Sequence, residues 1–188
     1  MNTPLSNERV RLRALEPTDV DLLLRWENDP SAWTTGNTHT PCSRQRAWQY
    51  LQSHDGDLYA AGELRLVIET AGHDSRAVGC IDLTSFDPFH GRAEVGILID
   101  ERERGRGYGR DALELLKGYA FDHIGMRQLF AVVPTDNDAS IALFEGCGFV
   151  ACGTLRDWLR RGSGYRAARL YQCIAPPRRS LDTESIVF

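Results

Sequence analysis

The hexapeptide Arg104-Gly105-Arg106-Gly107-Tyr108-Gly109 lies between an apolar run, 95–99, and a stretch with apolar residues at helical spacing that begins near Arg110. This order predicts a strand, a glycine-rich turn and a helix. In such a turn, backbone N–H groups converge on an anion at the positive end of the helix. Glycine removes the Cβ atoms that would block close approach, and arginine adds charge-assisted hydrogen bonds to phosphate. The sequence therefore predicts a pyrophosphate-binding site.

The spacing of the glycines restricts the kind of phosphate ligand. The chain has no Gly-Lys-Ser or Gly-Lys-Thr triplet, which a nucleoside triphosphate loop requires. The dinucleotide pattern G-x-G-x-x-G is also absent, because Arg110 stands where its last glycine should be. What matches is R-x-x-G-x-G, formed by Arg104, Gly107 and Gly109. A solvated loop, or part of an RNA-binding segment, remains an alternative for the hexapeptide alone.

Composition is typical of one globular domain. The chain has 188 residues, of which 42% are hydrophobic and 26% charged, and a net charge of −4. This charge disfavours nucleic acid as a partner, and no apolar run approaches the roughly 20 residues of a membrane span. The start has no signal-peptide pattern. The five cysteines include no C-x-x-C pair, so we expect free thiols in the cytoplasm and no metal site.

Strand and helix patterns alternate along the chain without an interdomain linker. Period-two or continuous apolar patterns predict strands over 8–15, 64–68, 78–83, 93–99, 128–133, 149–155 and 169–174. Helical spacing predicts helices from about 17, 43, 110 and 137. We therefore expect a single α/β domain with a mixed sheet over 1–175, followed by a tail over 176–188.

Several motifs in order resemble one known family. Besides R-x-x-G-x-G, these are the opening Arg11-Leu12-Arg13, the run Asn137-Asp138-Ala139-Ser140, the closing pair Gly148-Phe149, and the stretch 164–169. Together they resemble the GNAT N-acetyltransferases, in the branch of ribosomal-protein N-terminal acetyltransferases and bacterial spermidine/spermine N-acetyltransferases. The resemblance implies a mixed sheet of about six to seven strands with about four flanking helices. It also implies that the sheet is splayed open between the loop strand and the next strand to hold acetyl-CoA.

The resemblance also implies which residues hold acetyl-CoA. Backbone groups of Ile97, Leu98 and Ile99 would pair with the pantetheine arm like an added strand. Asn137 would contact the same arm, with Ser140 nearby and Phe144 packed against the cofactor. The amides that would hold the pyrophosphate belong to Arg104, Gly105, Arg106, Gly107, Tyr108, Gly109 and Arg110.

Acetyl transfer needs a neutral amine, a polarised carbonyl and a thiolate that leaves. Glu94 is the candidate general base, acting through water; the alternative is a strand-end carboxylate paired to an arginine. A backbone N–H near Leu98 would polarise the carbonyl. In the polyamine enzymes a tyrosine serves as general acid at the position of Phe144, and phenylalanine cannot donate a proton. Tyr165 or a water would then take this role, or the acid is dispensable.

The acceptor is less defined than the cofactor. The polyamine enzymes carry an acidic patch after the first helix, but the matching stretch here, 33–37, has no carboxylate. Trp26, Trp33 and Trp48 either line an acceptor cleft or belong to the core. A small amine or polyamine is the first expectation, and a peptide N-terminus is the alternative. A non-catalytic acyl-CoA-binding module is the alternative from another class. A homo-oligomer is also expected.

Overall fold

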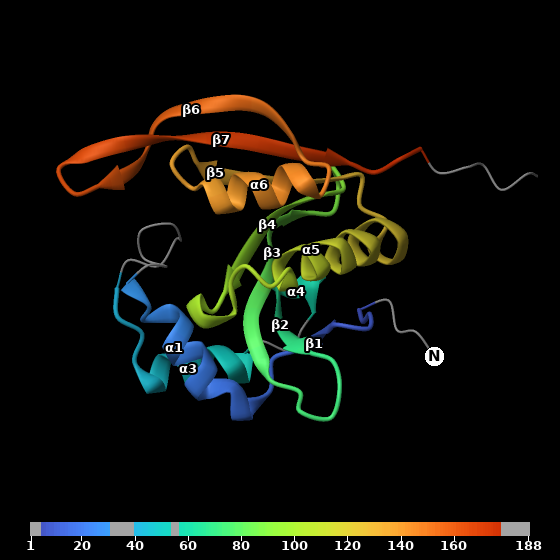
Figure 1. Ribbon diagram of the computed structural model, residues 1–188, viewed down its shortest axis with the longest axis vertical. Helices are drawn as coiled ribbons and strands as arrows, with labels where there is room; N and C mark the ends of the chain where they lie inside the picture. Colours follow the sequence, from blue (N-terminus) through green and yellow to red (C-terminus); the bar gives the residue numbers. More distant parts are fainter. Residues whose placement is uncertain (1–4, 31–39, 54–56, 178–188) are drawn as a thin grey trace, which may run out of the picture.

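The computed structural model describes residues 5–30, 40–53 and 57–177. Seven strands form one sheet in the order β1-β2-β3-β4-β5-β7-β6 (Figure 1). They are β1 (Val10–Ala14), β2 (Leu64–Thr70), β3 (Ala77–Asp87), β4 (Arg92–Ile99), β5 (Gln128–Pro134), β6 (Val150–Arg161) and β7 (Gly164–Ile174). Only β4 and β5 pair in parallel. The single mixed sheet confirms the predicted α/β fold.

The described residues form five α-helices, which are α1 (Val20–Glu27), α3 (Arg44–Ser53), α4 (Leu58–Ala61), α5 (Tyr108–Gly118) and α6 (Asp138–Gly146). Two short 3₁₀ turns, η1 (Pro17–Asp19) and η2 (Glu101–Glu103), and a π-helical continuation of α5, η3 (Tyr119–Ile124), complete the list. The helix that the sequence did not predict is α4, a single turn. Its cap is Asp57, whose carboxylate accepts hydrogen bonds from the backbone N–H groups of Tyr59 and Ala60.

The helices cover both faces of the sheet. Ile81 and Cys80 are neighbours on β3, so their side chains point to opposite faces. Ile81 packs in the large apolar cluster with Leu116 of α5 and Phe144 of α6, whereas Cys80 packs with Trp26 of α1. Figure 1 shows α1 and α3 on one side of β3 and α5 on the other. Apolar burial on both faces therefore holds the central strands in place.

The sheet opens between β4 and β5. The last of three parallel pairs joins Glu94 to Phe130. Beyond it, β4 continues to Ile99 beside β3, and β5 continues to Pro134 beside β7. In the described part of the chain, the facing edges of β4 and β5 have no strand partner beyond this point. We call this opening the split, and it agrees with the splayed sheet that the resemblance implies.

The β6–β7 hairpin is longer than the sequence predicts. β6 extends six residues past the predicted end at Leu155, to Arg161, and β7 begins at Gly164 rather than at Arg169. Most side chains in the extension are exposed, so the apolar alternation that marks a half-buried strand is missing there. Most of the predicted tail, 176–188, lies outside the described residues. None of the described helices has the length and apolar character needed to cross a membrane.

Candidate active site

Backbone direction alternates along the open edge of β4. The Asp100 N–H donates to the Val78 carbonyl at 2.9 Å, which fixes the hydrogen-bonding phase of the β3–β4 pair. In this phase Leu98 exchanges hydrogen bonds with Cys80, because hydrogen-bonded and non-bonded pairs alternate in an antiparallel ladder. The N–H and C=O groups of Leu98 therefore point toward β3.

Ile97 and Ile99 are the residues whose backbone groups face the split. The Ile99 carbonyl accepts a hydrogen bond from Arg104 Nε at 3.0 Å, which agrees with this direction. The sequence predicts a polarising backbone N–H near Leu98; in this register the N–H of Leu98 itself points toward β3, and that of its neighbour Ile97 faces the split. An extended chain can pair with Ile97 and Ile99 as an added strand.

The glycine-rich loop that follows β4 has the geometry of an anion site. Gly105 and Gly107 have φ values of 75° and 85°, a left-handed conformation that costs other residues about 1–2 kcal/mol. Gly107 is the N-cap of α5, so the N–H groups of Tyr108, Gly109 and Arg110 have no acceptor within the helix. They lie at the positive end of the helix dipole, where an anion is stabilised.

The arginine side chains of the loop contact protein groups. Arg104 donates to the Ile99 carbonyl, and Arg106 Nη1 lies 3.6 Å from a carboxylate oxygen of Glu103. We therefore expect the backbone N–H groups to be the principal donors to an anion.

The loop and the split are continuous. A Cβ built on Gly109 would lie 3.5 Å from side-chain atoms of both Ile99 and Leu143, and 3.7 Å from one of Ile97. The first turn of α5, the open edge of β4 and helix α6 therefore meet at this glycine. An elongated ligand with an anionic part fits such a continuous site, with its extended arm along β4.

The predicted residues of α6 have structural contacts of their own. Asn137 caps the helix, because its side-chain oxygen accepts a hydrogen bond from the Ser140 N–H at 3.1 Å. Phe144 is only 3% exposed and its ring packs edge-on against Phe149 at a centroid distance of 5.0 Å. The ring of Phe144 is therefore a core group, and it offers no proton donor.

Glu94 lies where β4 and β5 separate. It belongs to the last parallel pair, opposite Phe130 of β5, and its partner on β3 is the uncharged Thr84. Burial raises the pKa of Glu94 above its usual range, and a hydrogen bond from the Ser85 hydroxyl lowers it in part. A carboxylate with a raised pKa beside the split suits proton transfer near neutral pH.

Ser85 reaches Glu94 because β3 is irregular at this point. The β3–β4 register shifts between Thr84 and Asp87, and Ser85 has a φ of 50°. In a regular strand the side chain of Ser85 would point to the face of the sheet opposite to that of Thr84 and Glu94. A bulge can redirect the side chain to the face of Glu94. Left-handed backbone at a non-glycine residue costs on the order of 1–3 kcal/mol and concentrates at functional sites.

Replacing Ser85 with alanine should move the acidic limb of the pH–rate profile to higher pH. The hydroxyl lowers the pKa of Glu94, so its loss raises that pKa and protonates the base at a higher pH. The measurement is kcat/KM against pH, with a decrease of less than about tenfold on the high-pH plateau. Ser85→Gly is the matched control, because it also lacks the hydroxyl but relieves the backbone strain. If the acidic limb of the pH–rate profile stays at the wild-type pH in both variants, the hydroxyl does not lower the pKa of Glu94.

The structure does not bring Tyr165 to Glu94. On β7 the residue level with Glu94 is Gln172, through Phe130 of β5. Tyr165 lies seven residues further along β7, a path of roughly 23 Å, and is 61% exposed. Neither Tyr165 nor Phe144 is therefore placed to protonate a leaving group beside Glu94. That water takes this role, or that no acid is needed, stays a prediction.

An acidic cluster (Glu27, Glu63 and Asp82) lies on the same face of the sheet as Glu94. Asp82 accepts two hydrogen bonds from Arg65, each 3.0 Å long, and Arg65 also donates to Glu27 at 2.6 Å. Burial raises the pKa of Asp82, and the charges of Glu27 and Glu63 act in the same direction. Asp82 and Glu27 thus share the guanidinium of Arg65, while Glu63 acts on Asp82 through its charge.

The tryptophans divide between core and surface. Trp26 is buried, and its Nε1–H donates to Asp100 at 2.9 Å, which ties α1 to the end of β4. Trp48 of α3 is partly exposed, and Trp33, with the rest of 33–37, lies outside the described residues. Trp26 is therefore a core residue and not part of an acceptor cleft.

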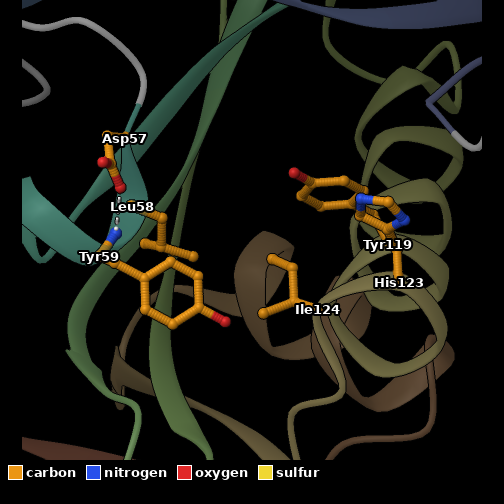
Figure 2. A pocket seen from close by; sticks show the side chains of 6 residues that line it. All are labelled: Asp57, Leu58, Tyr59, Tyr119, His123 and Ile124. Carbon is orange, nitrogen blue, oxygen red and sulfur yellow. Dashed lines mark hydrogen bonds between the residues drawn. The ribbon is translucent and has the colours of Figure 1, made fainter.

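A separate pocket of about 270 Å³ lies at the far end of α5 from the glycine-rich loop. Figure 2 shows its two walls, with Leu58 and Tyr59 of α4 opposite Tyr119, His123 and Ile124 of η3. Helix α5 separates this pocket from the split, because the glycine-rich loop lies at the start of α5 and the pocket lies past its end. The pocket is therefore not part of the proposed cofactor site. Among the described side chains, no three His, Cys, Asp or Glu residues gather in a group that could hold a metal ion.

Sequence reasoning missed Ser85, Asp82 and Arg65. Arg65 and Asp82 lie next to apolar residues on β2 and β3, and such a pattern predicts a strand without indicating a functional role for its polar residues. Ser85 carries no signal in the sequence, since only its backbone conformation directs it to Glu94.

Comparison with known proteins agrees with this geometry. A family model described as an acetyltransferase (GNAT) domain matches residues 9–150. An uncharacterized N-acetyltransferase of Bacillus licheniformis, p20, is 27% identical over 154 residues, which cover 82% of this chain and 86% of that protein. The spermidine N(1)-acetyltransferase of Vibrio cholerae is 25% identical over 149 residues, which cover 79% and 83% of the two chains.

The fold has a close counterpart among solved structures. A crystal structure of spermidine N-acetyltransferase from Vibrio cholerae in complex with CoA and spermine superposes with a TM-score of 0.80 at 23% identity. The similarity covers 89% of this chain and 96% of that one, and it shows a shared fold. Because the family model spans about three quarters of the sequence, this chain belongs to the GNAT acetyltransferase family.

Proposed function

We propose that this chain transfers the acetyl group of acetyl-CoA to a primary amine of a small polycation, with Glu94 as the general base. The observation that carries the proposal is the position of Glu94 at the point where β4 and β5 separate, with the acidic cluster on its face of the sheet. Acetyl-CoA is the co-substrate of the family. It supplies an acetyl group activated as a thioester.

Three parts of the chain would hold acetyl-CoA. The N–H groups that begin α5 would receive the pyrophosphate, as the loop glycines allow close approach. The outward-facing backbone groups of Ile97 and Ile99 would pair with the pantetheine amides. Asn137 at the start of α6 would lie on the other side of the arm.

Different groups of the protein would serve the separate steps of acetyl transfer. Glu94, as carboxylate, would take a proton from the acceptor ammonium through water, so that the amine nitrogen can attack. A backbone N–H of β4 that faces the split, best that of Ile97, would stabilise the negative charge that develops on the carbonyl oxygen. A free thiol has a pKa of about 8.5, so the thiolate can leave and take its proton from water.

The acidic cluster supports a cationic acceptor. Asp82 is paired with Gly96 and Glu94 with Thr84, so the two carboxylates are diagonal neighbours, about 7–8 Å apart at the backbone. A second carboxylate at this spacing from Glu94 favours an acceptor with more than one ammonium group. The polyamine named for the Vibrio cholerae relative has this chemistry.

Measuring CoA-thiol release with a panel of amines tests the acceptor class. We expect kcat/KM for spermidine and spermine at least about tenfold above that for a monoamine such as phenethylamine, because the carboxylates bind the additional charge. The advantage should shrink at high salt. Selective turnover of a short peptide with a free N-terminus would instead identify a protein N-terminal acetyltransferase. Acetyl-CoA binding with no turnover of any amine would indicate a non-catalytic acyl-CoA-binding module. Assembly into a homo-oligomer stays a prediction.

A further inference from the structure

Arg9 connects the edge of the sheet to the glycine-rich loop. It precedes the first residue of β1, and its guanidinium donates a hydrogen bond to the carbonyl of Arg106, 97 positions away in sequence. The same guanidinium lies over the ring of Tyr108, 5.7 Å from the centroid. A Cβ built on Gly107 would lie 3.2 Å from Arg9 Nη1, so the group also packs directly beneath the loop.

Arg9 also pairs with an acid in the first turn of α5. Its Nη1 lies 3.1 Å from a carboxylate oxygen of Asp111. An acidic residue in a first helical turn is stabilised by the positive end of the helix dipole. At this helix the same end should receive a pyrophosphate, so an unpaired Asp111 would repel the ligand. The positive charge of Arg9 opposes this repulsion.

The other acid beside the loop has cationic partners of its own. Glu103 accepts from Arg76, with Nη2 at 3.1 Å, and Arg106 lies 3.6 Å away. Asp111 therefore depends on Arg9 for its neutralisation, since no other cation of the described residues lies within ion-pair distance of it.

We propose that Arg9 is a positioning residue for the cofactor site, which holds the glycine-rich loop open to the pyrophosphate and neutralises Asp111. The inference rests on the proposed use of the loop for acetyl-CoA. Arg9 makes three kinds of contact at once: a hydrogen bond to the loop backbone, an ion pair, and stacking on Tyr108. A planar guanidinium supports all three, and an ammonium group does not.

Calorimetric titration with acetyl-CoA and with acetyl-pantetheine, which lacks the pyrophosphate, tests this role. We expect Arg9→Met to weaken acetyl-CoA binding about tenfold or more and to leave acetyl-pantetheine binding unchanged. Arg9→Lys should lose less, because it keeps the charge. In the Arg9→Met background, Asp111→Asn should recover part of the lost affinity, since it removes the unpaired acid. In kinetics, KM for acetyl-CoA should rise and KM for the amine should not.

Arg11→Met is the matched control. Arg11 lies two residues further along, within β1. Its side chain is 52% exposed against 54% for Arg9, and its partner is Glu69 instead of the loop. The inference would be overturned if wild type, Arg9→Met and Arg9→Lys bound acetyl-CoA with equal affinity. It would also be overturned if Arg9→Met lost as much affinity for acetyl-pantetheine as for acetyl-CoA. If Arg9→Met does not fold, unchanged affinity in Arg9→Lys alone overturns it. Absence of acetyl-CoA binding in the wild type would contradict the proposed function itself.

Discussion

Glu94→Gln should lower kcat about 100- to 1,000-fold at neutral pH, because it removes the group that accepts the proton of the acceptor amine. Glutamine keeps the shape of the side chain and can still meet the Ser85 hydroxyl. The dissociation constant of acetyl-CoA should therefore stay unchanged. Stopped-time assays of CoA-thiol release, combined with calorimetric titration of acetyl-CoA, measure the two quantities separately.

The pH dependence makes this prediction specific. Burial raises the pKa of Glu94, so in the wild type the rate falls as the pH drops through that raised value and the base becomes protonated. Glu94→Gln should lose this acidic limb. Glu114→Gln is a suitable control, since Glu114 forms a surface ion pair with Lys117 on α5. If Glu94→Gln kept the kcat of the wild type, Glu94 would not be the general base and its role would be structural.

Gly107→Val should weaken the binding of acetyl-CoA at least about tenfold. Two effects add up. The residue has a φ of 85°, which costs a non-glycine residue about 1–2 kcal/mol and a β-branched one more. Its Cβ would also press on Arg9 Nη1 at 3.2 Å. Both effects displace the N–H groups that begin α5.

The matched control for this change is Gly118→Val. Gly118 ends α5 in ordinary helical backbone, and a built Cβ would meet no atom within 4 Å beyond its chain neighbours and its own helix backbone, so valine fits there. Far-ultraviolet circular dichroism and Tm establish that both variants are folded before titration. Unchanged cofactor affinity in folded Gly107→Val would contradict the assignment of the loop to pyrophosphate.

The cofactor half of the site is predictable from the sequence because its signals are local. The loop glycines, the apolar run before them and the helical spacing after them fall within about 25 consecutive residues. The identity of the outward-facing residues is not predictable in this way. Whether Leu98 or its neighbours face the split depends on the phase of hydrogen bonding with β3, which a single strand does not encode.

The remaining site residues depend on contacts between distant segments. Arg9 meets Arg106 across 97 positions, and Ser85 meets Glu94 only through a bulge and a left-handed backbone. Tyr165 was a candidate because it lies in a stretch that resembles the family. The exposed extension of the β6–β7 hairpin, which has no apolar alternation, carries it away from Glu94. The sequence shows that phenylalanine, and not tyrosine, stands at position 144. It does not show that the ring of Phe144 packs against Phe149.

Amide hydrogen exchange with and without CoA is the most direct test of the central claim, that the split and the glycine-rich loop form one cofactor site. We predict that CoA protects the amides of Ile97 and Ile99 and those of 105–110, while the pocket between α4 and η3 is unaffected. Protection confined to the α4–η3 pocket, or no change along β4 and the loop at saturating CoA, would contradict the account.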